Sequence, residues 1–134
     1  MRSELVPVDM SDRLFAEVTS EVRRFAGEEG DDGLVNVFVP HATAAVVLME
    51  TGSGSESDLE DALNRLLPRD HRYTHGHGSP GHGADHLVPG FLGSSVTIPV
   101  VGGDLQLGTW QSVVLVDFNE DNPQRRVRLS FLSG

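Results

Sequence analysis

The sequence predicts one compact α+β domain, in which mostly antiparallel β-sheets form a sandwich accompanied by two helices. The chain has 134 residues, the size of a single domain, and 38 % of them are hydrophobic, as in ordinary globular proteins. Apolar residues recur at helical spacing in two segments, and short β-rich runs occupy much of the remaining chain. Two helices among about six or seven strands are typical of an α+β fold. We find no internal repeat or domain boundary, so residues 1–134 are expected to fold together.

The two predicted helices each begin at a polar cap and end at a helix breaker. The first follows Asp9 or Ser11 and stops at Gly27. Its apolar residues at helical spacing are Leu14, Val18, Val22 and Phe25. The second helix is capped by Ser55 and closed by Pro68. Its apolar face consists of Leu59, Ala62, Leu63, Leu66 and Leu67.

The predicted strands are short runs rich in β-branched and apolar residues. They cover residues 4–8, 34–39, 44–49, 95–101, 104–107, 110–118 and 125–132. Gly102-Gly103 is a hairpin signal between two of them. Residues 69–90 show no periodicity and hold five of the six histidines together with five glycines. Segments of this length without regular structure are usually functional or disordered.

Composition excludes several kinds of function. The formal net charge of −10 repels phosphate backbones and anionic bilayers, so we expect neither nucleic acid nor a membrane as a partner. An anionic ligand would therefore need arginine or a metal to hold it. The absence of cysteine and lysine excludes disulfides, thiolate nucleophiles, Schiff-base chemistry and a Walker-type phosphate loop. No apolar run of signal-peptide length follows the N-terminus, so a cytoplasmic location is expected.

The strongest chemical feature is the set of histidines. His41 follows Pro40 at the end of a predicted strand, and the other five crowd residues 69–90. Imidazole is the commonest metal ligand, and three neutral imidazoles with a water form an open site of the Zn²⁺ type. Spacing alone leaves solvated loop histidines as an equal alternative, because no compact pair occupies a recognisable helix or strand. Those interpreted singly as bystanders are His71, His77 and His82.

Two carboxylates are further candidates. Glu50 ends the strand over residues 44–49 and is either a general base or a solvated strand terminus. Asp58 lies in the first turn of the second helix, where it complements the helix dipole. Neither carboxylate is assigned a catalytic role by its position alone.

One short segment contains the only tryptophan. Trp110 could stack on a flat heterocycle, with Thr109 and Gln111 as hydrogen-bonding neighbours, or it could be buried in a sheet interface. Near the C-terminus, Arg125 and Arg126 would either clamp a phosphate or pair with the acidic surface. The residues alone leave both pairs of alternatives open.

Six segments follow one another over roughly residues 34 to 132. They are Pro40-His41-Ala42-Thr43-Ala44-Ala45, Tyr73-x-His75, His86-Leu87, Leu92-Gly93-Ser94-Ser95, Ile98-Pro99-Val100 and Leu107-Gly108-Thr109-Trp110-Gln111. In content and order they resemble the signature blocks of the YjbQ-like secondary thiamine-phosphate synthase family. The stretch from the Ser-x-x-x-Pro segment to Gly-Thr-Trp-Gln is the most specific part, and the C-terminal arginine pair also fits.

The resemblance implies a compact α+β fold with a sandwich of sheets, and a homotrimer with sites near the subunit boundaries. His41, His75 and His86 fall on the family's recurring histidine positions and are the expected ligands of a divalent metal, with zinc as the favoured ion. Glu50 and Asp58 fall on the family's strand-end glutamate and helix aspartate, which implies that both are catalytic.

The sequence departs from the family's pattern around these positions. Met49 and Thr51 replace two asparagines, and Gly52-Ser53-Gly54 replaces an Asp-Pro-Asp-type segment with one residue deleted. An Asn-Ala-Asp-Ala segment is replaced by residues 82–85, His-Gly-Ala-Asp. The wall of the site is therefore altered, and either His82 joins the ligands or Asp85 takes over from a shifted aspartate.

The family name implies that a pyrimidine diphosphate and a thiazole phosphate are joined into thiamine phosphate with release of pyrophosphate. In that hypothesis the metal binds the oxygens of the leaving group, and Arg126 assists it. Trp110 faces an aromatic ring of the substrate, and its neighbours Thr109 and Gln111 also contact the substrate. A second hypothesis is metal-assisted hydrolysis of a small phosphoester, with Glu50 as the base. A third is a non-catalytic trimer that binds a metal or a small ligand.

Overall fold

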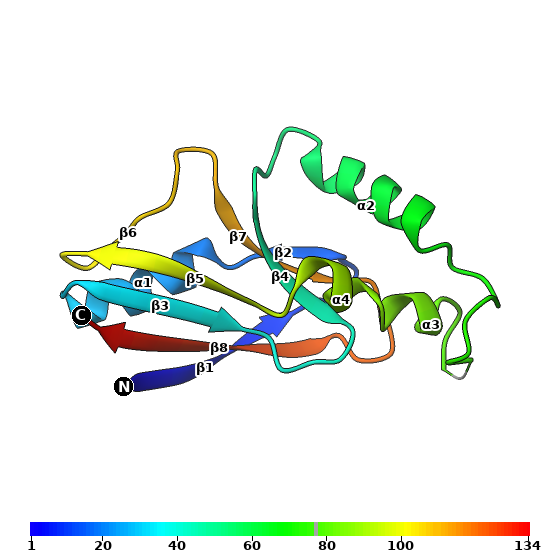
Figure 1. Ribbon diagram of the computed structural model, residues 1–134, viewed down its shortest axis with the longest axis horizontal. Coiled ribbons are helices and arrows are strands. Elements are labelled where there is room, and N and C mark those ends of the chain that lie inside the picture. Colours follow the sequence, from blue (N-terminus) through cyan, green and yellow to red (C-terminus); the bar gives the residue numbers. More distant parts are fainter. Residues whose placement is uncertain (77) are drawn as a thin grey trace.

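The computed structural model describes residues 1–76 and 78–134, so His77, interpreted above as a bystander, lies outside the described residues. The elements are β1 (Arg2–Asp9), β2 (Phe15–Glu17), α1 (Thr19–Glu29), β3 (Gly33–Phe38), β4 (Ala44–Met49), α2 (Ser55–Leu66), α3 (His82–Asp85), α4 (Val88–Leu92), β5 (Ser95–Val101), β6 (Asp104–Leu105), β7 (Ser112–Asp117) and β8 (Gln124–Ser133) (Figure 1). None of these helices is long and apolar enough to cross a membrane.

The strands form two antiparallel sheets. A five-stranded sheet has the order β1-β8-β3-β5-β6, and a three-stranded sheet has the order β2-β7-β4. Every strand pair in the described residues is antiparallel. The two sheets pack on a common core that also includes residues of α1. These observations confirm the predicted α+β class and the sandwich of sheets.

Strand β8 alternates between buried and exposed residues because only one face of the large sheet is covered. Val127, Leu129 and Phe131 are at most 2 % exposed and join the core between the sheets. Arg126 and Arg128, which alternate with them, are exposed. This is the pattern of an antiparallel sheet with one face toward water.

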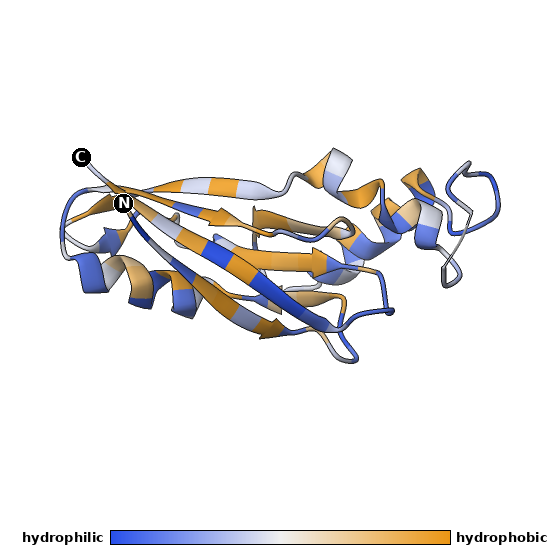
Figure 2. Ribbon diagram, turned by 90° about the horizontal axis from the view of Figure 1, so that it is seen from below, coloured by the Kyte–Doolittle hydropathy of each residue, from blue (hydrophilic) through white to orange (hydrophobic). Residues whose placement is uncertain are grey.

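Strand β7 has an uninterrupted apolar sequence because both of its faces are covered. Val113 and Leu115 lie in the core between the sheets. Val114 and Val116 join a second cluster, which includes residues of α2, α3 and α4. The small sheet is therefore a middle layer, between the large sheet and helices α2, α3 and α4. Figure 2 shows the hydrophobic residues concentrated along the strands, with hydrophilic residues in the connecting loops.

The predicted bounds of the first helix were wrong at both ends. Residues 15–17 form strand β2, whose backbone groups bond to β7, and α1 begins only at Thr19. The apolar spacing from Leu14 to Val18 therefore arises from packing around a strand rather than from helical turns. At the other end, Gly27 lies inside α1, and the helix ends at Glu29, followed by Gly30, which adopts a left-handed φ of 70°.

The aperiodic segment 69–90 is also more structured than expected. It contains α3 and the start of α4, so the described residues hold four helices rather than two. Helices of one turn are too short for apolar residues to repeat, so periodicity could not reveal them. The strand predicted over residues 110–118 begins instead at Ser112, because Gln111 N donates to Gly108 O at 3.1 Å and closes a turn around Trp110.

Candidate metal centre

Three histidines converge at one end of the molecule. His75, His82 and His86 each offer a ring nitrogen, and these three atoms lie within 4.8 Å of one another. Nε2 of His82 is 2.9 Å from Nε2 of His86, and the ring of His75 stacks on that of His82 at a centroid distance of 4.8 Å. His75 is exposed, whereas His82 and His86 are half-buried. We call these three residues the histidine cluster.

Local structure explains why these side chains meet. His82 begins α3 and His86 caps its C-terminus, so the two residues are four apart on one helical turn and share a face. His75 is brought to them by the preceding loop, which packs closely on Gly83. A Cβ atom at Gly83 would lie 2.7 Å from the carbonyl oxygen of His75 and 2.8 Å from Cβ of Tyr73. Glycine is therefore required for the loop to approach the helix.

A buried carboxylate holds α3 in place. Asp85 is fully buried and forms an ion pair with Arg69. It also accepts a hydrogen bond from Nδ2 of Asn119 at 3.1 Å. Arg69 donates in addition to the carbonyl oxygen of Pro80 at 3.0 Å, just before the helix. The turn that carries His82 is thus tied to both the preceding loop and the β7–β8 connection.

The β7–β8 connection also contacts His82 directly. Nδ1 of His82 lies 3.2 Å from Nδ2 of Asn119 and 3.4 Å from Oδ2 of Asp121. The Ser79 hydroxyl donates to Oδ2 of Asp121 at 3.1 Å and lowers the pKa of this carboxyl below its usual value. Asn119 and Asp121 were not found from the sequence, since they lie more than 30 residues from the histidine that they contact.

His41, the third predicted ligand, lies in different surroundings. Its Nε2 accepts a hydrogen bond from the backbone N–H of Arg126 at 3.0 Å. Burial, followed by the nearby charge of Arg125, lowers the pKa of His41 below its usual value, so the neutral ring is favoured. Among the described residues, the group able to hold a metal contains His82 where the sequence favoured His41, whose role as a ligand stays a prediction.

A buried ion pair lies behind His41. Nε of Arg125 donates to Oδ2 of Asp117 at 2.6 Å, and the two side chains are only 8 % and 1 % exposed. Thr43 donates to Oδ1 of Asp117 at 2.9 Å. Arg125 therefore has a structural partner, whereas the neighbouring Arg126 is exposed on β8.

The other predicted residues lie at the opposite end of β4 and β7. Glu50 follows Met49, which pairs with Ser112, whereas the histidine cluster lies beyond the end where Ala44 pairs with Asp117. The intervening strand is about 17 Å long at about 3.4 Å per residue. The residues at this far end are exposed: Glu50, Thr109, Trp110 and Gln111. Asp58 lies eight residues after Glu50, in the first turn of α2. Trp110 is 75 % exposed, so the buried interpretation of this side chain was wrong.

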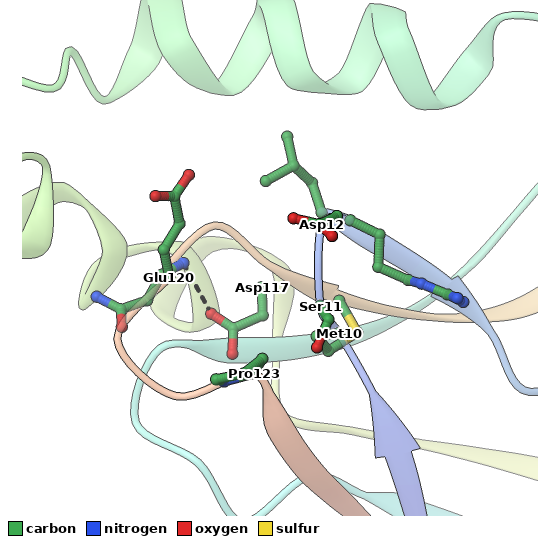
Figure 3. Close-up of a pocket in the computed structure, with 9 residues that line it drawn as sticks. Met10, Ser11, Asp12, Asp117, Glu120 and Pro123 are labelled. Atoms are coloured by element: carbon green, nitrogen blue, oxygen red, sulfur yellow. Dashed lines mark hydrogen bonds between the residues drawn. The ribbon is translucent and has the colours of Figure 1, made fainter.

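Two cavities lie near the Asn119 network. One of about 570 Å³ is beside the histidine cluster and is lined in part by Arg69, Tyr73, His75 and His82. The other, of about 700 Å³, is lined by residues 10–14 and by the connection that follows β7. Figure 3 shows the second cavity, in which Met10, Ser11 and Asp12 face Glu120 across the opening. Of the two, the smaller cavity is the one lined by His75 and His82 of the cluster.

The fold and the cluster define a small α+β protein of two stacked antiparallel sheets with a three-histidine candidate metal centre. The chain belongs to the family described as UPF0047 protein YjbQ-like, whose model matches residues 6–134. This confirms the YjbQ-like resemblance inferred from the signature segments.

Relatives and solved structures agree with this assignment. The chain is 60 % identical to the UPF0047 protein Rv2556c of Mycobacterium tuberculosis over 134 residues, covering 100 % of both proteins. It is similar to the crystal structure of a hypothetical protein from Aeropyrum pernix K1, with a TM-score of 0.90, 31 % identity and coverage of 100 % of both chains. A YbjQ-like protein of unknown function from Sulfolobus solfataricus P2 matches with a TM-score of 0.91 and 25 % identity, covering 99 % of this chain and 97 % of that one.

Proposed function

We propose that this chain is a metal-dependent enzyme for a small phosphorylated substrate, with the thiamine-phosphate synthase reaction as its leading activity. The observation that supports the proposal is the convergence of His75, His82 and His86, whose ligand atoms lie within 4.8 Å of one another. In that reaction a pyrimidine diphosphate and a thiazole phosphate are joined, and pyrophosphate leaves.

The donor set fits a transition metal better than Mg²⁺. Imidazole nitrogen suits Zn²⁺, whereas Mg²⁺ prefers oxygen ligands. Two nitrogens bound to Zn²⁺ at 2.0–2.1 Å in a tetrahedron lie about 3.3 Å apart. The Nε2 atoms of His82 and His86, at 2.9 Å, are therefore close to a ligand spacing. A bound divalent cation would supply positive charge for the oxygens of a leaving group.

An arginine of the chain provides a second positive charge beside the cluster. Because the net charge is −10, an anionic substrate needs a local positive group. Arg69 lines the cavity beside the histidine cluster and is 31 % exposed while paired with Asp85. In this proposal Arg69 orients a substrate phosphate at the cluster, a role that sequence had given to Arg126.

A homotrimer is part of the same proposal. Trp110, Gln111 and Glu50 are exposed and separated from the histidine cluster by the length of β4. A second copy that placed its Trp110 loop against the cluster would bring the two groups into one site. Light scattering of the purified chain is expected to give three times the 14.5 kDa mass, and a monomeric mass would contradict this. We extend the proposal to a cytoplasmic location.

The first experiment measures metal content by elemental analysis of the parent chain and of His86→Ala. We expect a bound Zn²⁺-like ion in the parent and its loss in the variant. Thiamine phosphate formation is then assayed with both substrates before and after removal of the metal. A parent chain that neither contains nor takes up Zn²⁺, Mn²⁺ or Ni²⁺ would refute the metal centre.

Hydrolysis of a small phosphoester is the second candidate. A three-histidine centre with an open position is the arrangement that lowers the pKa of a bound water to about 7. Glu50, the predicted base, lies at the other end of β4 and would have to come from a second copy. Phosphate release from simple esters without any thiazole substrate would favour this candidate. If Glu50→Ala changed neither ligand affinity nor any turnover, a non-catalytic trimer would be favoured.

A further inference from the structure

The two ring nitrogens of His82 face different partners. Its Nε2 lies 2.9 Å from Nε2 of His86, on the side of the cluster. Its Nδ1 lies 3.2 Å from Nδ2 of Asn119 and 3.4 Å from Oδ2 of Asp121. A neutral imidazole carries one N–H, so the partner chosen by Nδ1 decides whether Nε2 can bind a metal.

Pairing with Asn119 blocks metal binding. The Asn119 amide is fixed at both ends, because its Oδ1 accepts from the Asp121 backbone N–H at 3.0 Å and its Nδ2 donates to Asp85 at 3.1 Å. The amide therefore presents a donor to His82, and Nδ1 must accept. The ring proton is then on Nε2, from which it donates to His86. In this tautomer His82 has no lone pair available for a metal on the side of the cluster.

Pairing with Asp121 has the opposite effect. A carboxylate only accepts, so Nδ1 must carry the proton, and the lone pair of Nε2 is released toward the cluster. The Ser79 hydroxyl holds the same carboxylate oxygen at 3.1 Å, which fixes its orientation. This is the carboxylate–histidine–metal arrangement that commonly sets the tautomer and the ring orientation of metal ligands.

We propose that Asp121 is the positioning residue of the metal centre: it selects the metal-binding tautomer of His82, whereas Asn119 holds the metal-free one. Metal binding then moves His82 from one partner to the other. Nε2 releases its proton to water, and Nδ1 takes one from water, so the ring stays neutral. This inference rests on the proposed metal centre.

The test is the affinity for Zn²⁺ alone, measured by competition with a chromophoric chelator. We expect Asp121→Asn, whose amide keeps the size of the side chain, to bind Zn²⁺ about 10–100-fold more weakly than the parent. Asp121→Glu restores the carboxylate and is expected to recover part of the affinity. Glu120→Gln removes the same charge one residue away and is the matched control, with the affinity of the parent.

A spectroscopic measurement separates a tautomer effect from a general structural one. In chains labelled with ¹⁵N-histidine, His82 is expected to carry its proton on Nε2 without metal and on Nδ1 with Zn²⁺. Unchanged protonation of Nε2, or an Asp121→Asn affinity equal to that of the parent, would overturn the role of Asp121 and leave the metal centre standing. A parent chain that binds no Zn²⁺ would overturn the metal centre itself.

Discussion

At one end of β4 and β7, where Ala44 pairs with Asp117, polar side chains are buried and bonded to one another. At the other end, where Met49 pairs with Ser112, the polar and aromatic residues are exposed on two loops. The first end, which carries the histidine cluster, is organised within a single chain. The second end, which carries Trp110, is held in the described residues by exposed contacts, such as the hydrogen bond from the Gly108 N–H to Oε1 of Gln111 at 2.9 Å. We refer to them as the histidine end and the tryptophan end. In the proposed function, the histidine end of one chain would hold the metal, and substrate contacts from Trp110 would come from another copy.

The largest effect is expected from breaking the buried ion pair at the histidine end. Arg125→Ala leaves Asp117 as an uncompensated buried charge and should lower the free energy of unfolding by about 3–5 kcal/mol. Arg126→Ala removes an exposed arginine from the next position of the same strand and should change it by less than about 0.5 kcal/mol. Urea denaturation of both variants measures the difference, and equal midpoints would contradict the comparison.

The next effect is on metal affinity. His86→Ala removes one of the three proposed ligands. It should reduce Zn²⁺ affinity by more than the loss of about 10–100-fold that is expected when only the hydrogen-bond partner of a ligand is removed. Gln111→Ala, at the tryptophan end, should leave the affinity unchanged. Isothermal titration with Zn²⁺ tests both variants. If Gln111→Ala lost as much Zn²⁺ affinity as His86→Ala, residues of both ends would belong to one metal site.

A smaller effect concerns the pH dependence of stability. Burial, and then Arg125, lowers the pKa of folded His41 below the unfolded value of about 6.5. The unfolded chain therefore binds the proton more readily. The contribution of His41 to stability is fully present above pH about 6.5 and is lost as the pH falls through the lower folded pKa.

His41→Gln keeps a side-chain acceptor but cannot titrate, so it should flatten the fall in stability between pH 7 and pH 5. Urea denaturation across this range compares the variant with the parent. An identical fall in both chains would show that His41 does not contribute to it.

The smallest effect on folding is expected at the tryptophan end. Because Trp110 is 75 % exposed, Trp110→Ala should change the free energy of unfolding of a single chain by less than about 0.5 kcal/mol. The same variant should weaken self-association in light scattering at low concentration. A large loss of stability with no change in association would show that Trp110 packs within its own chain.

The sequence predicted most strands correctly because their apolar residues alternate or run together over five or more positions. In the candidate site the sequence singled out His75 and His86. It interpreted His82 by itself as a bystander, but the departure from the family pattern left His82 open as an additional ligand. The spacing of four between His82 and His86 was visible in the sequence, but no helix was recognised there, because α3 is only one turn long. Gly81 and Gly83 flank its first residue. Those glycines permit a left-handed turn before α3 and the close approach of the His75 loop, which only the folded chain reveals.

The polar partners of His82 could not be predicted for a different reason. Asn119 lies 37 residues from His82 along the chain, and its contact depends on how the β7–β8 connection folds back toward α3. No local sequence pattern predicts such a contact. His41 was placed correctly at a strand end, but the backbone N–H of Arg126 occupies its Nε2, and sequence carries no sign of that bond.

Burial of β7 on both faces has a consequence for strand alignment. A slip of one residue moves every side chain of a strand to the opposite face. In β7 such a slip would exchange Val114 and Val116 for Val113 and Leu115, so apolar would replace apolar on both sides. Hydrophobic burial therefore distinguishes poorly between the correct alignment and its neighbour.

The polar contacts at the two ends of β7 distinguish the correct strand alignment from the slipped one. The Val113 N–H donates to the Thr19 hydroxyl at 2.8 Å at the start of the strand, and Asp117 accepts from Thr43 at 2.9 Å at its end. A slipped strand would separate Asp117 from Thr43 and Arg125 and leave a buried charge unpaired. The buried polar side chains at the histidine end thus also fix the register of the middle strand.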